Sequence, residues 1–185
     1  EVRIGIKFFY TDTHANFVID GGDMGDSRTR KNLTQERTDA VTAIKFSDLP
    51  LADALVFKQG KGTRKLAVVS GPFCGYCRNL ERDLAALKDV TIYTFLLPTI
   101  SQASMPKSKD VMCAKEPAVA WRALMIDGIQ PDEASAECSA KQKAPERVLG
   151  FGGKHHIQST PTMFFEDGAR VRAIATAGGS SELML

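Results

Sequence analysis

Residues 65–77 read KLAVVSGPFCGYC and carry a Cys-x-x-Cys motif where a strand gives way to a helix. Up to Ser70 the stretch is an apolar run of the length expected for a buried parallel strand. Gly71-Pro72 ends that run. Beyond the motif, one helical face carries the leucines at 80, 84 and 87. We therefore expect Cys74 at or just before a helix start, with Cys77 about one turn further on.

This position has a chemical consequence for the two thiols. The free N–H groups and the dipole of a helix N-terminus favour negative charge. A cysteine held there loses its proton more readily, and the thiolate is the form that attacks disulfides. Cys77 lies close enough along a helix to reach back to the sulfur of Cys74. The pair can thus cycle between dithiol and disulfide, or release a trapped mixed disulfide, which indicates redox catalysis.

Two other uses of a Cys-x-x-Cys motif are a zinc site and a short structural disulfide. A zinc site usually needs a second close pair of cysteines or histidines. The remaining cysteines, Cys113 and Cys138, stand alone and far apart in the sequence. The strand–motif–helix context favours redox chemistry, so we expect neither a metal nor another cofactor.

Cys113 and Cys138 are either a disulfide or two unpaired buried thiols. If joined, they close a loop of about 25 residues, worth roughly 3–4 kcal/mol in the chain-entropy model. Such bridges persist in secreted or periplasmic proteins and are rare in the cytosol. The even count of four cysteines favours an oxidising compartment.

The composition excludes several classes of function. The chain has 185 residues, 43% of them hydrophobic and 25% charged, as in ordinary globular domains. A formal net charge of +2 is too small to indicate a nucleic-acid or membrane-surface partner. No apolar stretch is long enough to cross a bilayer. No signal peptide is seen, so the sequence is either that of a mature exported protein or that of a cytosolic one.

The first 62 residues divide into a ribbon and a connector. Residues 1–23 predict a β-ribbon with strands at 2–8 and 16–20, too small to bury a core alone and so expected to pair with a second copy. Because the chain begins almost inside a strand, we expect upstream sequence to be missing. The connector predicts a helix capped by Asn32 or Thr34 and running to about Lys45. Further helical spacing follows at Leu51, Ala54 and Leu55.

The rest of the chain completes an α/β pattern. Residues 90–97 predict a second buried strand, which makes a right-handed βαβ unit with a parallel sheet. Residues 99–143 carry no strand pattern and predict short helices around a core Trp121, and residues 144–157 predict a weak helix. Residues 162–165 predict a third strand, joined by an Asp-Gly hairpin to a half-exposed strand at 169–174. A last helix is expected to open at 178–180, and we expect the C-terminus to be disordered or truncated.

This order of elements, with Thr160-Pro161 directly before the third strand, resembles the thioredoxin fold. More narrowly, residues 49–62, 64–68 and 74–81 resemble the DsbC/DsbG group of bacterial periplasmic thiol:disulfide isomerases. Residues 112–115 and 136–138 resemble that group's helical insertion. The resemblance implies an α/β (α+β) fold: an N-terminal β-rich dimerisation domain at 1–30, a linker helix region at 31–62, and a thioredoxin-like catalytic domain at 63–185 with an insertion at 99–143.

The resemblance also implies roles for particular residues. Cys74 would be the nucleophile and Cys77 the resolving cysteine. Thr160 and Pro161 would form a cis peptide facing them and bind an extended substrate together with Gly75 and Tyr76. Cys113 and Cys138 would form the structural disulfide of the insertion.

The implied biology is that of a periplasmic homodimer. It would isomerise wrong disulfides in misfolded proteins, with a membrane thiol reductase of the DsbD type as electron donor. Neither nucleic-acid binding nor membrane insertion is expected. Two alternatives remain: a DsbG-like reductase of single oxidised cysteines, and a chaperone that holds unfolded chains without turnover.

The sequence departs from the thioredoxin pattern in two respects. Thioredoxins keep a buried acidic residue on the strand before the motif, whereas residues 66–70 are uncharged here. Removal of the Cys77 proton then needs water or a helix carboxylate. Glu81 lies one turn beyond Cys77, and we expect it to be a surface charge of the helix. The N-terminal domain is also shorter than in the DsbC/DsbG group.

Overall fold

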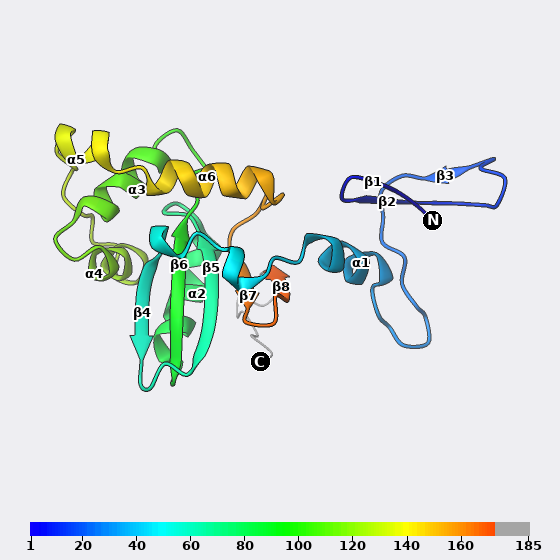
Figure 1. The fold of residues 1–185 in the computed structure, drawn as a ribbon, viewed down its shortest axis with the longest axis horizontal. Helices are drawn as coiled ribbons and strands as arrows, with labels where there is room; N and C mark the ends of the chain where they lie inside the picture. Colours follow the sequence, from blue (N-terminus) through cyan, green and yellow to red (C-terminus); the bar gives the residue numbers. More distant parts are fainter. Residues whose placement is uncertain (173–185) are drawn as a thin grey trace. The chain divides into compact units, whose positions relative to one another are not determined.

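The computed structural model describes residues 1–172 and divides the chain into two compact units (Figure 1). The first unit is Glu1–Ala43, and the second begins at Ile44. The segment boundaries expected at residues 30 and 62, and the roles attached to them, stay predictions.

The first unit is a small antiparallel sheet followed by a helix. Its strands lie in the order β1-β2-β3, and the elements are β1 (Val2–Ile4), β2 (Lys7–Thr11), β3 (Val18–Ile19) and α1 (Leu33–Thr42). The prediction of one continuous strand over residues 2–8 was wrong. The chain reverses after Ile4, and Ile4 pairs with Lys7. Gly5 permits this turn with a φ of +63°, a left-handed value that glycine adopts without strain.

Helix α1 begins where the sequence predicts. The Asn32 side chain accepts a hydrogen bond from the backbone N–H of Gln35 at 2.8 Å, which satisfies one of the free donors of the first turn. The helix ends at Thr42, about one turn earlier than expected.

The second unit is built on a five-stranded sheet of order β4-β6-β5-β7-β8. The strands are β4 (Leu55–Gln59), β5 (Arg64–Ser70), β6 (Val90–Leu96), β7 (Thr162–Phe165) and β8 (Arg170–Arg172). The pair β5–β6 is parallel and is joined by α2 (Gly75–Ala86), so the predicted βαβ unit is confirmed. The other neighbouring strands are antiparallel.

Strand β4 replaces the helical spacing expected around residue 55. Leu55 and Phe57 are buried while Val56 and Lys58 are exposed, which is the period of two typical of a strand. It pairs in register with β6, from Leu55 opposite Thr94 to Gln59 opposite Val90. The leucine and alanine spacing before residue 55 instead forms short 3₁₀ turns.

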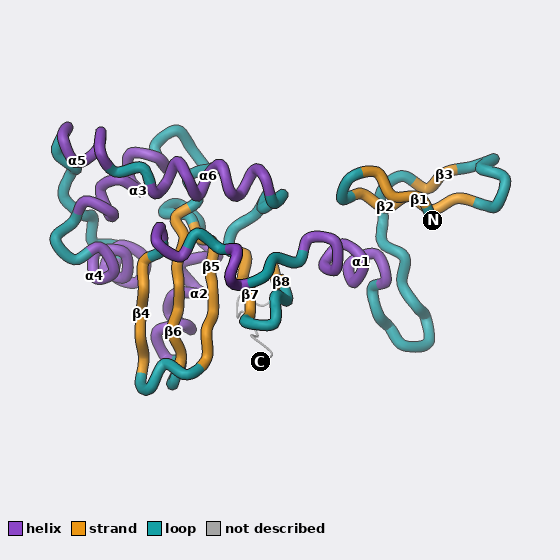
Figure 2. The backbone as a smooth tube through the Cα atoms, viewed as in Figure 1, coloured by secondary structure: helices purple, strands orange, loops and turns teal. Residues whose placement is uncertain are grey.

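Helices cover both faces of this sheet (Figure 2). Leu66 and Val68 of β5 pack in the core with α2 and Trp121, while Ala67 and Val69 point to the opposite face and pack with Val148. The remaining helices are α3 (Ser104–Cys113), α4 (Pro117–Arg122), a π-helical segment (Ala123–Asp127), α5 (Ala136–Lys141) and α6 (Ala144–Lys154). Residues 99–143 thus form helices and no strand, as predicted.

The helices of the described chain and the end of strand β8 bear on the remaining predictions. Among residues 1–172, none of the helices combines the length and the apolar character that a membrane crossing requires. Strand β8 is described to residue 172, so the rest of the strand predicted at 169–174 and the helix predicted from 178–180 lie outside the described residues.

Candidate active site at the start of helix α2

Cys74 is the N-cap residue of α2, directly after the strand β5 and a short turn. Its backbone is extended, with φ −86° and ψ 112°, and its N–H donates to the carbonyl of Gly71 at 3.1 Å. The backbone N–H of Cys77 donates to the Cys74 sulfur at 3.1 Å. The two cysteines form a disulfide with their Cα atoms 5.1 Å apart.

Both cysteines pack in the same core cluster and are buried. Cys74 is 5% exposed at the start of the helix, and Cys77 is 1% exposed. In the reduced protein the N–H of Cys77 and the dipole of α2 stabilise a thiolate on Cys74. Cys77 lies one turn further along α2, and its sulfur is bonded to that of Cys74.

The Thr160–Pro161 peptide is cis, as the resemblance implies. The carbonyl oxygen of Thr160 lies 3.3 Å from the Cys74 sulfur, although the two residues are 86 positions apart. Pairing of β5 with β7 brings them together, because Val69 at the end of β5 lies opposite Thr162 at the start of β7. The cysteine pair and the proline loop thus meet at one end of the sheet.

Apolar side chains are exposed around this end. Tyr76 and Phe73 are 59% and 42% exposed, and Ile100 is 48% exposed. A Cβ added at Gly71 would lie 3.3 Å from the Ile100 side chain, so Ile100 borders the turn that leads to Cys74. Gly75 is exposed, and a Cβ there would meet nothing within 4 Å. Of the residues proposed for substrate contact, Gly75 and Tyr76 are exposed, Thr160 is half-buried and Pro161 is buried beside the shielded Cys74 sulfur.

Glu81 is buried, so its assignment as a surface charge was wrong. It is 2% exposed and lies on the same face of α2 as Cys77 and Leu84. The indole Nε1–H of Trp121 donates to Glu81 Oε2 at 3.1 Å, and Arg122 Nε donates to Oε1 at 3.3 Å. Burial raises the pKa of the Glu81 carboxyl, against the lowering effect of Trp121 and Arg122. The spacing 77, 81, 84 already placed position 81 on the buried face.

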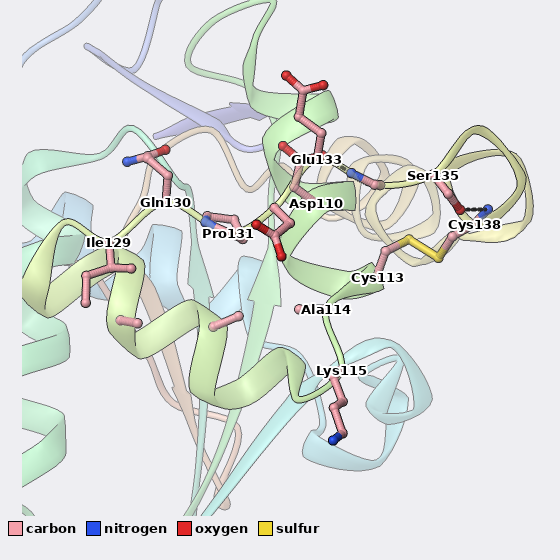
Figure 3. Close-up of a pocket in the computed structure, with 14 residues that line it drawn as sticks. Asp110, Cys113, Ala114, Lys115, Ile129, Gln130, Pro131, Glu133, Ser135 and Cys138 are labelled. Atoms are coloured by element: carbon pink, nitrogen blue, oxygen red, sulfur yellow. Dashed lines mark hydrogen bonds between the residues drawn. A yellow bond between two sulfur atoms is a disulfide. The ribbon is translucent and has the colours of Figure 1, made fainter.

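Cys113 and Cys138 are joined by a disulfide that links the last residue of α3 to α5, with their Cα atoms 6.1 Å apart. This disulfide borders a cavity of about 470 Å³ (Figure 3). The residues that line the cavity come from 110–138, and neither Cys74 nor Cys77 is among them. Within residues 1–172, no group of three or more His, Cys, Asp and Glu side chains could hold a metal ion.

Comparison with known proteins agrees with this geometry. A family model described as a thioredoxin-like domain matches residues 51–182. The chain is 39% identical over 175 residues to a protein of Bordetella avium named probable thiol:disulfide interchange protein DsbC, and 38% identical over 171 residues to its Bordetella parapertussis counterpart. These alignments cover 94% and 92% of this chain but 61% and 59% of those relatives, so the chain spans about three-fifths of their length.

Solved structures show the same relationship. A disulfide interchange protein from Neisseria gonorrhoeae superposes with a TM-score of 0.61 at 26% identity, over 67% of this chain and 87% of that one. A thioredoxin-like oxidoreductase from Silicibacter pomeroyi shares the fold alone, with a TM-score of 0.51 at 16% identity over 65% and 83% of the two chains. These comparisons confirm the resemblance to DsbC drawn from the sequence. With its fold, its cysteine pair and the family match in agreement, this chain belongs to the thioredoxin-like domain family.

Proposed function

We propose that this protein is a thiol:disulfide interchange enzyme that isomerises wrong disulfides in exported proteins through reduced Cys74 and Cys77. The observation that carries the proposal is the position of the Cys74 sulfur. It caps α2, accepts the N–H of Cys77, and lies 3.3 Å from the carbonyl of the cis Thr160–Pro161 loop. The curated relatives at 38–39% identity are named probable thiol:disulfide interchange protein DsbC.

The cycle begins with the Cys74 thiolate, which attacks one sulfur of a client disulfide. A bond forms between Cys74 and that sulfur, and the other client sulfur leaves as a thiolate. This thiolate attacks elsewhere in the client until a client sulfur displaces Cys74 and restores its thiolate. Electrons are conserved over the cycle. When a complex stalls, Cys77 attacks Cys74, the client leaves reduced, and the Cys74–Cys77 disulfide remains.

The client is bound as an extended segment by Thr160, Pro161, Gly75 and Tyr76. Backbone groups of the Thr160–Pro161 loop are presented beside the attacking sulfur, as in recognition by strand addition. The exposed ring of Tyr76 supplies apolar contact to a misfolded chain.

In the proposed organisation, residues 1–30 form the dimerisation domain, residues 31–62 the linker, and residues 63–185 the catalytic domain. The insertion at 99–143 is cross-linked by the Cys113–Cys138 disulfide. Exposed apolar side chains on the three-stranded sheet support pairing with a second copy: Val2, Ile4, Val18 and Ile19. The protein would act in the periplasm, where the Cys113–Cys138 bridge persists. A DsbD-like membrane reductase would return Cys74 and Cys77 to the dithiol.

The test is reactivation of scrambled ribonuclease by the reduced protein. Cys74→Ala should abolish reactivation, and Cys77→Ala should accumulate a mixed disulfide that is separable on a non-reducing gel. Asn79→Ala, which changes an exposed side chain of the same helix, is the control and should leave the rate unchanged. Wild-type reactivation by Cys74→Ala would refute the assignment of the nucleophile.

A second candidate, a chaperone without turnover, is supported by the exposure of Phe73, Tyr76 and Ile100 at the site. This activity predicts that the Cys74→Ala/Cys77→Ala variant still suppresses aggregation of an unfolded client. If suppression disappears with the two thiols, binding depends on the mixed disulfide and the chaperone reading fails.

A further inference from the structure

A buried carboxylate lies one helical turn from the resolving cysteine. Cys77 and Glu81 are four residues apart on α2, and side chains at this spacing lie on the same helix face. They are 1% and 2% exposed. Ionisable side chains are rarely buried this far without a role or a full set of partners.

The contacts of Glu81 differ from those of a strong buried ion pair. Trp121 donates to one carboxylate oxygen, and Arg122 contacts the other through Nε alone. The Arg122 Nη2 is buried without a hydrogen-bond partner among the described residues, and its guanidinium lies over the Phe57 ring, 4.3 Å from the centroid. The pair therefore lacks the bidentate geometry that makes a buried ion pair strong.

A comparison of the buried carboxylates also selects Glu81. Residues 1–172 contain two buried carboxylates, Asp53 and Glu81. Asp53 is bound by Arg147 of α6, which packs on the opposite face of the sheet. Strand β5 directly before the motif contributes only uncharged side chains to the core. Among the described residues, Glu81 is thus the carboxylate buried on the same side as Cys77.

We propose that the Glu81 carboxylate accepts the proton of the Cys77 thiol when Cys77 resolves a mixed disulfide. The inference rests on the exchange chemistry proposed above. The thiol gives its proton to Glu81, and the sulfur attacks Cys74. The bond between Cys74 and the client sulfur breaks, and the client leaves as a thiolate that takes up the proton. The client has gained two electrons, and the Cys74–Cys77 pair has lost them.

The surroundings of Glu81 suit this role. An apolar environment disfavours the ionised form of a thiol as it does that of a carboxyl. Burial raises the pKa of Glu81 above its ordinary value, so its carboxylate is a stronger proton acceptor than an exposed one. Arg122 of α4 is the charged side chain that contacts the carboxylate and opposes this shift. The other elements on this face contribute apolar side chains, namely Leu66, Val68, Ile92, Leu124 and Met125.

The experiment separates the two thiols by reacting the reduced protein with dithiobis-nitrobenzoate. The first thionitrobenzoate released reports attack by Cys74, and the second reports resolution by Cys77. Both phases are followed by stopped flow from about pH 5 to about pH 9, which spans the titration of a raised carboxyl and of a thiol. Glu81→Gln keeps an acceptor for the Trp121 N–H. Glu166→Gln is the matched control, because Glu166 is an exposed residue paired with Lys65.

We expect Glu81→Gln to slow the second phase by about 100-fold near neutral pH, the low end of general-base effects. Its rate should rejoin the wild-type rate at high pH, where the thiol ionises unaided, and its first phase should be unchanged. Glu166→Gln should match wild type in both phases. An unchanged second-phase pH profile in Glu81→Gln, or equal slowing of both phases at every pH, would overturn the inference. Absence of the first phase in wild type would instead refute the proposed function.

Arg122→Gln gives an independent test if Glu81→Gln does not fold. Removal of this guanidinium removes the charge that lowers the pKa of Glu81. The second-phase inflection should therefore move to higher pH, while the first phase keeps its profile. An inflection that stays in place would overturn the inference, since a carboxylate with a purely structural role has no influence on this profile.

Discussion

Removal of the Cys113–Cys138 disulfide is expected to destabilise the protein by an amount that follows from the loop it closes. The cysteines are 25 positions apart. In the chain-entropy model, a loop of this length lowers the entropy of the unfolded chain by about 12 cal/mol/K, or about 3.5 kcal/mol at 25 °C. We expect Cys113→Ala/Cys138→Ala to lose about this much unfolding free energy, which is a large part of a domain's total.

The assay is urea unfolding followed by the fluorescence of Trp121, the single tryptophan of the chain. Trp121 is fully buried and lies inside the loop that the disulfide closes. Both proteins should carry Cys74→Ala/Cys77→Ala, so that thiol exchange cannot reshuffle the bridge. The slope m should also rise in the variant, because an unfolded chain without the cross-link exposes more surface.

Reduction of the parent protein with dithiothreitol is the matched control. It opens the same bridge without deleting sulfur atoms, so its loss of stability should equal that of the alanine variant. A loss below about 1 kcal/mol with an unchanged m would refute the reasoning. The insertion would then be held by the packing of its helices and not by the loop constraint.

Three further predictions concern the core of the second unit. Asp53→Ala should lower the unfolding free energy by about 2 kcal/mol, because it removes charge-assisted hydrogen bonds to Arg147 from a buried site. A change below about 0.5 kcal/mol in urea unfolding would contradict this. Leu80→Ala, on the buried face of α2, should lower the unfolding free energy by about 3 kcal/mol through lost burial and the cavity left behind. A loss near zero, as at an exposed position, would show that this face of the helix is not packed. Glu81 has a folded-state pKa raised above its ordinary 4.5, so its contribution to stability is complete below that pH and is lost as pH rises through the folded value. Between about pH 4 and about pH 7, the urea midpoint of the wild type should therefore fall more than that of Glu81→Gln. An equal change of the midpoint in the two proteins would rule out the raised pKa.

The parts of the fold that the sequence predicted are those set by local pattern. The apolar run to Ser70, the break at Gly71-Pro72 and the leucine spacing after the motif each specify an element without reference to the rest of the chain. Together they placed Cys74 at the start of α2, where the structure has it. The Asn32 cap of α1 is local in the same sense.

The parts that it missed depend on partners distant in sequence or on a weak local signal. Strand β4 has only five residues, and its pairing with β6 across about 35 positions decides its conformation. The approach of Thr160 to Cys74 needs the register of β5 with β7, so only the resemblance to a family could suggest it. The turn at Gly5 was overlooked because alternation continues through it.

Glu81 was missed for a different reason, since its position was readable. Helical spacing from Cys77 places it on the buried face, whereas its charge favours the surface, so the two signals conflict. The structure resolves the conflict through Trp121 and Arg122, which come from another helix 40 residues away. A charged residue that helical spacing places on the buried face is therefore a sign that buried polar partners come from elsewhere in the fold.

The chain also shows how one kind of bond serves two purposes. Cys74 stands before the first turn of α2, where backbone N–H groups stabilise its thiolate, and its bond to Cys77 closes a loop of only three positions. Cys113 is the last residue of α3, where the helix dipole disfavours negative charge, and its bond closes a loop of 25 positions. Opening the first bridge releases little chain entropy and yields a stabilised thiolate. Opening the second releases a long loop and leaves Cys113 where a thiolate is disfavoured. Helix polarity and loop length together therefore favour exchange at Cys74 and persistence of the Cys113–Cys138 bond.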